Sequence, residues 1–244
     1  MFISFAMQPV LIFRFTQTEG PGYLGDFLSA KGVPQTQINV DLGDTIPLDI
    51  SGYSGLVLMG GPMSVNDPLP WIEPVLTVAR DAVKQAVPVL GHCLGGQLLS
   101  KALGGVITRS PVKEIGWGKV SKVDETQVTD WLGSLPREFD VFQWHGETFT
   151  LPLGARHLLR SAYCENQAYL IDNRHLGLQC HVEMTEAMIR AWCEVGSAEI
   201  AGARSSPAVQ LPEIIQENLA VRIAQLNRVA DVLYSRWAQG LVSI

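Results

Sequence analysis

The first half of the chain alternates short apolar runs with amphipathic stretches. The apolar runs have the length of buried strands and lie at residues 10–15, 37–40, 55–61 and 88–91. The stretches between them carry apolar residues at helical spacing, at residues 23–30, 71–85 and 94–105. Strands that alternate with helices are typical of parallel βαβ units. We therefore expect an α/β fold built on a doubly wound, mostly parallel sheet.

From residue 105 onward the pattern changes to closely spaced strands separated by turn signals. The strand candidates lie at residues 105–110, 115–123, 139–146, 157–163, 167–172 and 176–183. This spacing predicts a mixed-sheet extension of the parallel core.

The last part of the chain is predicted to be helical. Residues 185–195 form one helix, and a longer pattern places apolar residues on one face, at Ile215, Leu219, Ile223, Leu226, Val229, Leu233 and Trp237. We expect one domain at residues 1–196, with residues 197–244 forming a linker, rich in Ala, Ser and Gly between 196 and 212, and a C-terminal helical segment packed on that domain. A homodimer or partner contact is the alternative use of its apolar face.

Composition limits the classes of partner. The chain has 244 residues, 47% of them hydrophobic, and a formal net charge of −6, so it offers no basic surface for nucleic acid or an anionic membrane. The four cysteines are too scattered for a disulfide scaffold, which favours a reduced, cytoplasmic setting. The apolar start lacks the basic region of a signal peptide and is too short to span a bilayer, so we expect a short leader that runs into the first strand.

Residues 89–97 read VLGHCLGGQ and place Cys93 between a strand and a helix. Such a tight turn strains its central residue and needs small neighbours, which Gly91 and Gly95 supply. The helix N-terminus favours the thiolate, and the backbone N–H of Leu94 is placed to hold an oxyanion. An inert buried cysteine is the competing interpretation, but the flanking glycines favour a reactive one.

A thiol nucleophile needs a base, and His181 is the strongest candidate among the five histidines. It ends an apolar strand, and Glu183 follows two residues later on the same face if the strand continues. The carboxylate would then hold the imidazole, and a Cys–His–Glu triad would result. A structural histidine with an unrelated neighbouring acid is the alternative.

Several stretches together resemble the class I (triad) glutamine amidotransferases, most closely the glutaminase domain of GMP synthetase and its free-standing relatives. GHCLGGQ resembles the G-x-C-x-G-x-Q elbow of the family, and GLQCHVE resembles its G-x-Q-x-H-P-E. MGGPMSV resembles its oxyanion loop, FQWHGETFTLPLGA its S-H-G-D…L-P stretch, and CENQAYLI the segment before the histidine strand. The resemblance covers residues 10–195 and implies a flavodoxin-like sheet.

The resemblance also implies a role for each matching residue. Cys93 would attack the glutamine side-chain amide to form a thioester, His181 would act as base and then acid, and Glu183 would orient His181. The substrate-binding residues that it implies are Gly61 and Leu94, whose N–H groups would hold the oxyanion, and Gln97 and His145. No metal and no organic cofactor is expected. The resemblance leaves open whether an ammonia-accepting synthetase subunit works with the chain.

Three positions depart from the family pattern: Val182 replaces a proline, Trp144 a serine and Glu147 an aspartate. No glycine-rich ATP loop follows Glu183, so we do not expect this chain alone to be GMP synthetase. A γ-glutamyl hydrolase with the same triad is the main alternative to a glutaminase. An α/β-hydrolase with a cysteine elbow is disfavoured, because that fold places its acid before the histidine. A non-catalytic binding protein is disfavoured because all three triad residues are present.

Overall fold

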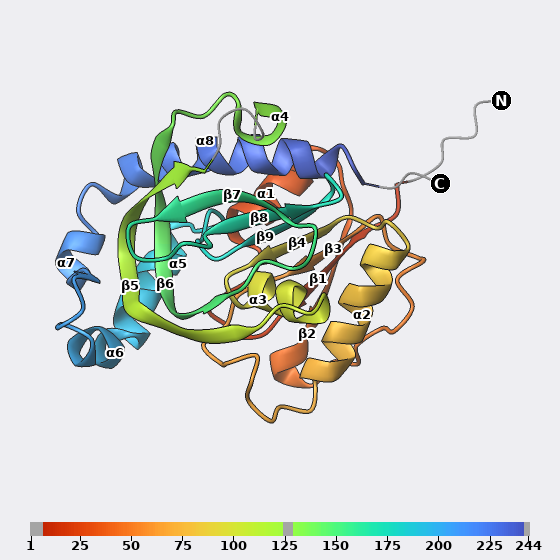
Figure 1. The fold of residues 1–244 in the computed structure, drawn as a ribbon, viewed down its shortest axis with the longest axis horizontal. Helices are drawn as coiled ribbons and strands as arrows, with labels where there is room; N and C mark the ends of the chain where they lie inside the picture. Colours follow the sequence, from red (N-terminus) through yellow and green to blue (C-terminus); the bar gives the residue numbers. More distant parts are fainter. Residues whose placement is uncertain (1–6, 124–128, 242–244) are drawn as a thin grey trace.

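The computed structural model describes residues 7–123 and 129–241. Its ten strands form one sheet in the order β10-β5-β7-β8-β9-β4-β3-β1-β2, with β6 paired to β5 (Figure 1). The strands are β1 Val10–Arg14, β2 Gln35–Asn39, β3 Gly55–Leu58, β4 Val89–His92, β5 Ile107–Lys122, β6 Glu138–Phe149, β7 Arg156–Ser161, β8 Ala168–Ile171, β9 His175–Leu178 and β10 Ala208–Val209. The helices are α1 Gly22–Ala30, α2 Ile72–Lys84, α3 Leu94–Ala102, α4 Thr129–Leu132, α5 Glu186–Val195, α6 Ser197–Gly202, α7 Pro212–Ile215 and α8 Leu219–Ala238, with a 3₁₀ turn at Val40–Leu42.

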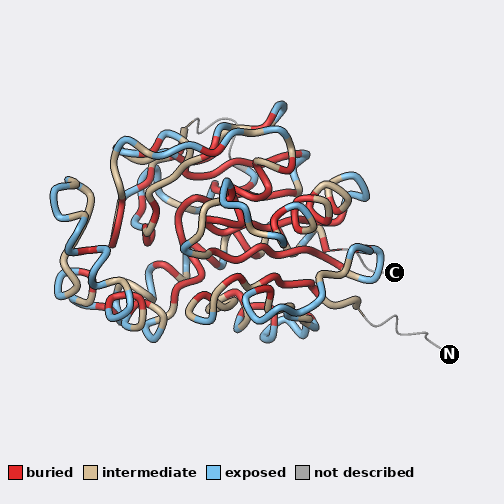
Figure 2. Tube along the Cα trace, turned by 90° about the horizontal axis from the view of Figure 1, so that it is seen from below, coloured by how far each residue is buried: buried red, intermediate tan, exposed pale blue. Residues whose placement is uncertain are grey.

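Strands β2, β1, β3, β4 and β9 are parallel and carry a hydrophobic core on each face. Alternate residues of β1 point to opposite faces, so Ile12 joins the core under α1 and α8 while Phe13 joins the core under α2 and α3. Figure 2 shows the strands as the buried interior, with exposed residues on the outer helices and loops. The expected doubly wound α/β fold is confirmed.

The expected mixed-sheet extension is also confirmed, with β5 to β8 pairing antiparallel. The prediction of two separate strands at 105–110 and 115–123 is wrong, because they form the single strand β5. A register shift between Arg109 and Glu114 interrupts its pairing with β6. Pro111 lies inside this bulge, where its missing N–H removes no ladder hydrogen bond.

Two other boundaries differ from the expectation. The strand predicted at 176–183 ends at Leu178, because the chain leaves β4 and β8 and forms a bridge between His181 and Phe142 of β6. The expected linker at 196–212 contains α6 and β10, and β10 pairs with β5 in the same sheet.

The long C-terminal pattern is divided at Asn218, which has a φ of 52° and starts α8 after the short α7. The buried face of α8 lies over the sheet beside α1, where Tyr23 Oη donates to Asp231 Oδ1 at 2.9 Å. None of the helices in the described ranges has the length and apolar character that a bilayer-crossing segment needs. Residues 1–6 of the expected leader lie outside the described residues.

Candidate active site

Cys93 occupies the turn between β4 and α3 with the strained backbone that its setting predicts. Its φ is 48° and its ψ is −106°, a conformation that non-glycine residues rarely adopt. A side chain on Gly95 would collide with the Leu58 carbonyl oxygen, and one on Gly91 would collide with the backbone of Gly95. The two glycines therefore let α3 pack directly against the ends of β3 and β4.

Two backbone groups flank Cys93 as the sequence indicates. Leu94 is the first residue of α3, so its N–H is among the first-turn donors without an acceptor inside the helix. Gly61 follows β3, and a Cβ atom built on it would lie 3.0 Å from Leu94 Cδ2. Gly61 and Cys93 line the same pocket.

His181 and Glu183 form a buried pair beside Cys93. His181 Nδ1 lies 2.6 Å from Glu183 Oε1, and both side chains are almost fully buried. Burial alone would raise the pKa of Glu183, but His181 and then His92 lower it to about 2. Burial likewise disfavours the charged imidazole, yet Glu183 and then Cys93 raise the pKa of His181 well above its ordinary value. The Glu183 carboxylate therefore makes His181 a stronger base than a free imidazole.

Glu183 is held by a contact that the sequence comparison did not anticipate. The backbone N–H of Val182 donates to Glu183 Oε2 at 2.9 Å. Proline, the usual family residue at this position, has no such N–H. The departure at Val182 therefore adds a donor to the carboxylate that orients His181.

The thiol itself does not match the expectation of a low pKa. Burial raises the pKa of Cys93 above its ordinary value, and attraction to His181 opposes this effect. The helix N-terminus and glycine elbow therefore do not by themselves make a free thiolate. In a thiol–imidazole pair the thiol ionises by passing its proton to the imidazole, and His181 is the imidazole beside Cys93.

Two glutamine amides lie in a chain that ends at the sulfur. Gln97 Nε2 donates to Gln179 Oε1 at 3.1 Å, and Gln179 Nε2 donates to Cys93 Sγ at 3.5 Å. Gln97 also approaches the Glu147 carbonyl oxygen at 3.4 Å. Gln97 was predicted as a substrate contact. Gln179 was not predicted, although it stands in the GLQCHVE stretch that also contains His181. Its contact could not be seen from strand periodicity, because β9 has already ended.

His145 lines the pocket, but both of its ring nitrogens face acceptors. Nδ1 lies 3.0 Å from the Glu147 carbonyl oxygen, and Nε2 lies 3.1 Å from Glu114 Oε2. Glu114 also accepts from Ser161 Oγ and Gln167 Nε2. This buried network holds the part of β6 whose Trp144 carbonyl oxygen lies 3.8 Å from Cys93 Sγ.

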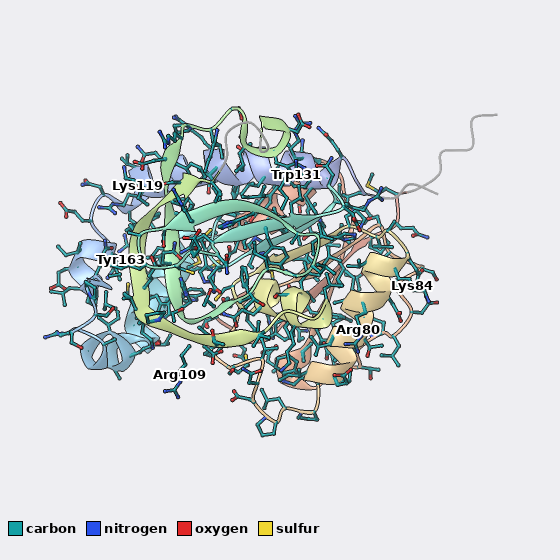
Figure 3. The ribbon with its side chains drawn as sticks, viewed as in Figure 1. Arg80, Lys84, Arg109, Lys119, Trp131 and Tyr163 are labelled. Carbon is teal, nitrogen blue, oxygen red and sulfur yellow. The ribbon has the colours of Figure 1, made fainter. Side chains whose placement is uncertain are left out.

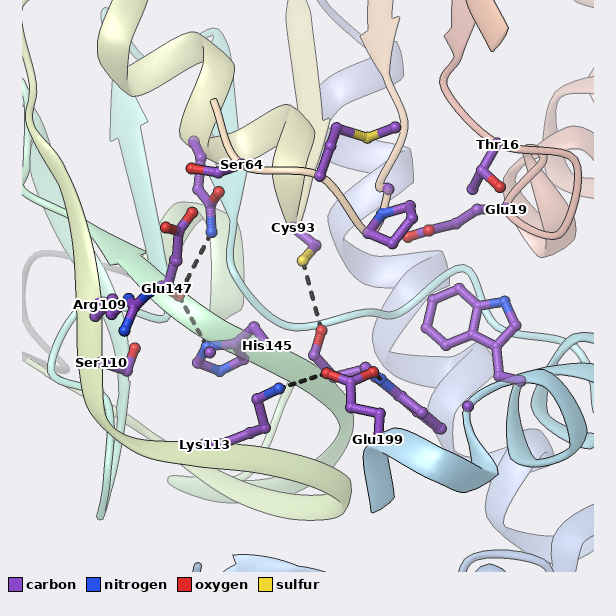
Figure 4. Close-up of a pocket in the computed structure, with 18 of the residues that line it drawn as sticks. Thr16, Glu19, Ser64, Cys93, Arg109, Ser110, Lys113, His145, Glu147 and Glu199 are labelled. Carbon is purple, nitrogen blue, oxygen red and sulfur yellow. Dashed lines mark hydrogen bonds and ion pairs between the residues drawn. The ribbon is translucent and has the colours of Figure 1, made fainter. Parts of the chain in front are cut away.

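The pocket around Cys93 has a volume of about 980 Å³. In Figure 4, Glu147, Arg109 and His145 lie on one side of Cys93, and Glu19 and Thr16 lie on the other. Arg109 projects from the outer edge of β5 (Figure 3). The departures at Trp144 and Glu147 both line this pocket, so they change its wall rather than the triad.

The C-terminal part of the chain completes the pocket. Glu199 of α6 accepts from Trp144 Nε1 at 2.9 Å and pairs with Lys113 at 2.5 Å. Trp192 of α5 packs edge-on against both Trp144 and His181. The segment expected to be a linker thus forms part of the site.

Within the part of the chain that the structure describes, two groups of buried side chains bring metal-ligand atoms within 4.8 Å of one another: Glu114, His145 and Cys164, and Glu19, His181 and Glu183. Each group contains a histidine–carboxylate contact.

The sequence model of the family Glutamine amidotransferase class-I matches residues 28–189, and the chain belongs to this family. The glutamine amidotransferase-like protein YfeJ of Salmonella typhimurium is 28% identical over 181 residues, covering 71% of this chain and 75% of the relative. A glutamine-hydrolysing GMP synthase of Aeropyrum pernix is 35% identical over 153 residues, covering 62% of this chain but 27% of the synthase. The aligned region thus spans about a quarter of that curated relative.

Two solved structures share the fold of this chain over nearly its whole length. A glutamine amidotransferase from Methylobacillus flagellatus is 47% identical, with a TM-score of 0.95 over 98% of this chain and 97% of that one. A glutamine amidotransferase from Thermotoga maritima is 27% identical, with a TM-score of 0.85 over 96% and 99%. The family and the doubly wound fold expected from the sequence are both confirmed.

Proposed function

We propose that this chain hydrolyses the side-chain amide of glutamine or of a γ-glutamyl compound through a thioester at Cys93. The observation that carries the proposal is the buried His181–Glu183 pair beside the strained Cys93 elbow, in a pocket that Gly61 also lines. The nearest alternative within the family is an acceptor-coupled reaction, in which an ammonia-using synthetase on another chain receives the nitrogen. Such a partner is suggested by the relatives that are named glutamine-hydrolysing GMP synthases.

The residues divide the reaction between them. The Cys93 proton passes to His181, and the sulfur attacks the amide carbon while the N–H groups of Gly61 and Leu94 hold the oxyanion. His181 then returns the proton to the leaving nitrogen as the carbon–nitrogen bond breaks. Water, deprotonated by His181, hydrolyses the thioester to glutamate and restores Cys93. Glu183 keeps the imidazole oriented and stabilises its charged form.

The size of the pocket favours γ-glutamyl amides as a second substrate class. Pockets of roughly 300–1,000 Å³ hold drug-sized ligands, and this one lies at the upper end at about 980 Å³. Glutamine with its ammonia leaving group fills a small part of such a space. A γ-glutamyl amide with a larger amine would use more of it.

The first test is release of glutamate from glutamine and from a panel of γ-glutamyl amides. Cys93→Ala should lower turnover by at least roughly a thousandfold on every substrate, because no other group can form the thioester. Cys193→Ala is the matched control, since Cys193 is also buried but does not line the pocket, and it should retain wild-type turnover. Turnover that survives Cys93→Ala would exclude the thioester mechanism.

A further inference from the structure

Glu19 is a pocket residue that the mechanism above does not use. It lies after β1, its side chain is almost fully buried, and it lines the pocket with Cys93. Its Oε1 lies 3.9 Å from His181 Nδ1, and a Cβ atom on Gly60 would collide with its carboxyl group. Among the described residues, His181 is the only charge partner of this carboxyl group, and none donates a hydrogen bond to it. A buried carboxyl group aimed into a pocket without a donor is expected to meet one in a ligand.

The segment that carries Glu19 is fixed on both sides. Trp192 Nε1 donates to the Thr18 carbonyl oxygen at 2.8 Å, and the Tyr23 N–H donates to the Glu183 carbonyl oxygen at 2.8 Å. The Glu19 N–H donates to the Thr16 carbonyl oxygen at 3.2 Å. The carboxyl group is thus held in place by the same elements that hold the triad.

The position of Glu19 relative to Cys93 assigns it to one end of the substrate. His181 must give its proton to the leaving nitrogen, so that nitrogen departs on the His181 side, where Glu19 also lies. Glu147 lies on the opposite side of Cys93 (Figure 4), and Gln97 contacts its carbonyl oxygen. The glutamyl part of a substrate therefore extends toward Gln97 and Glu147, and the leaving amine extends toward Glu19.

The walls near Glu19 describe the rest of the leaving group. Trp144 and Trp192 offer apolar ring surface. The other acid on this side, Glu199, is already matched by Lys113 and by Trp144 Nε1. Glu19 has no such partner among the described residues, so its carboxyl group is left to meet a polar group of a ligand.

We propose that Glu19 binds a protonated amino group on the leaving amine, so that the preferred substrates are γ-glutamyl amides of diamines. This inference rests on the proposed amide hydrolysis at Cys93. The alkyl chain between the two nitrogens lies along Trp144 and Trp192, and the distal ammonium meets the Glu19 carboxylate.

The reaction is balanced with water as the only co-reactant. The amide carbon–nitrogen bond breaks as the carbon–sulfur bond to Cys93 forms, and the proton on His181 goes to the departing nitrogen. The products of this step are the γ-glutamyl thioester and a diamine that keeps its distal ammonium. Water then adds its hydroxyl group to the thioester carbon and its proton to His181, which releases glutamate and the Cys93 thiolate.

The electrostatics of Glu19 are compatible with such a ligand. Burial raises the pKa of Glu19 to about 8, with His181 opposing this effect. A cation close to a carboxyl group lowers its pKa by about 1–3 units. A bound ammonium is therefore sufficient to ionise Glu19 near neutral pH.

The experiment uses the full chain and compares two amides of equal length as substrates. One is the γ-glutamyl amide of 1,4-diaminobutane, and the other is the γ-glutamyl amide of n-pentylamine, which replaces the ammonium by a methyl group. We expect the wild type to favour the charged amide in kcat/KM by roughly tenfold or more, as for hydrogen bonds to charged groups. Glu19→Gln should reduce this ratio to about one, mainly through the KM of the charged amide.

Binding separates this inference from the proposed hydrolysis. Calorimetry with Cys93→Ala should show the same preference for the charged amide, and Cys93→Ala combined with Glu19→Gln should lose it. If neither amide is hydrolysed by the wild type but the binding preference is present, the hydrolysis proposal fails and the Glu19 assignment stands. Equal affinity of Cys93→Ala for the two amides would overturn the assignment, as would a Glu19→Gln variant that keeps the preference.

Discussion

At the scale of single residues, three features surround the Cys93 sulfur. The glycine elbow positions the sulfur, the His181–Glu183 pair supplies a neighbouring base, and the Gln179 amide donates to it. Because burial raises the pKa of the thiol, each favourable contact matters for reaching the thiolate. The amide of Gln179 is a contact that favours the thiolate without carrying a charge.

The role of Gln179 can be measured through the reactivity of the thiol. Gln179→Leu should raise the pKa of Cys93 and slow its alkylation by iodoacetamide at pH 7 by about three- to tenfold, the effect of one hydrogen bond of about 1 kcal/mol. Gln143→Leu is the matched control, because Gln143 is a buried glutamine whose side-chain amide has no hydrogen-bond partner among the described residues. An alkylation rate for Gln179→Leu equal to that of Gln143→Leu would show that the amide does not act on the sulfur.

At the scale of elements, the periodic parts of the sequence were predictable. Helices α1, α2 and α5 and strands β1 to β4 lie within a few residues of the predicted ranges, since burial on a regular face leaves a regular pattern. Prediction failed where tertiary pairing decides the structure. The bulge around Pro111 keeps β5 continuous across a turn-like sequence, and the bridge to Phe142 ends β9 before His181.

In the candidate site, too, residues in short local patterns were predictable and residues placed by tertiary structure were not. The sequence was sufficient to name Cys93, His181 and Glu183 and the flanking Gly61 and Leu94, because each stands in a recognisable short pattern. Glu19 lies in a loop and Glu199 in a short helix without such a pattern, and Gln179 stands in the histidine pattern but after the end of β9. They reach the pocket through chain crossings that depend on the complete fold.

Helix α8 makes a testable contribution at this scale. Trp237 is almost fully buried, and its ring lies against Gly55 of β3, where an added Cβ would be 3.1 Å away. Trp237→Ala should lower the free energy of unfolding by about 3–5 kcal/mol in a denaturant titration. Val221→Ala, at an exposed position of the same helix, should change it by less than about 0.5 kcal/mol. If α8 instead served a contact between two copies, Trp237→Ala would alter the association state and leave the unfolding of the monomer unchanged.

At the scale of the whole molecule, two buried carboxyl groups couple folding to pH in opposite directions. The pKa of Glu183 is lowered to about 2, so its stabilising contribution is present above pH 4.5 and is lost as the pH falls toward 2. The pKa of Glu19 is raised to about 8, so the folded chain keeps a proton that the unfolded chain releases above about pH 4.5. Between those values the unfolded state binds fewer protons, and stability falls as the pH rises.

This linkage predicts how Glu19→Gln changes stability with pH. At pH 4.5 and below, the neutral amide replaces a neutral carboxyl group, and the two proteins should have similar free energies of unfolding. From pH 5 to 9 the variant should gain on the wild type by roughly 2–5 kcal/mol, since it has no proton to lose. Denaturant titrations at pH 4.5 and at pH 9 give the free energies of unfolding.

The control variant is Glu213→Gln, at an exposed glutamate of α7. Its free energy of unfolding should differ from that of the wild type by less than about 0.5 kcal/mol at either pH. A gain in stability for Glu19→Gln that does not grow with pH would mean that Glu19 is already ionised in the folded protein. A pH-dependent gain in stability together with a loss of preference for the charged amide would mark Glu19 as a residue kept for substrate binding at the expense of stability.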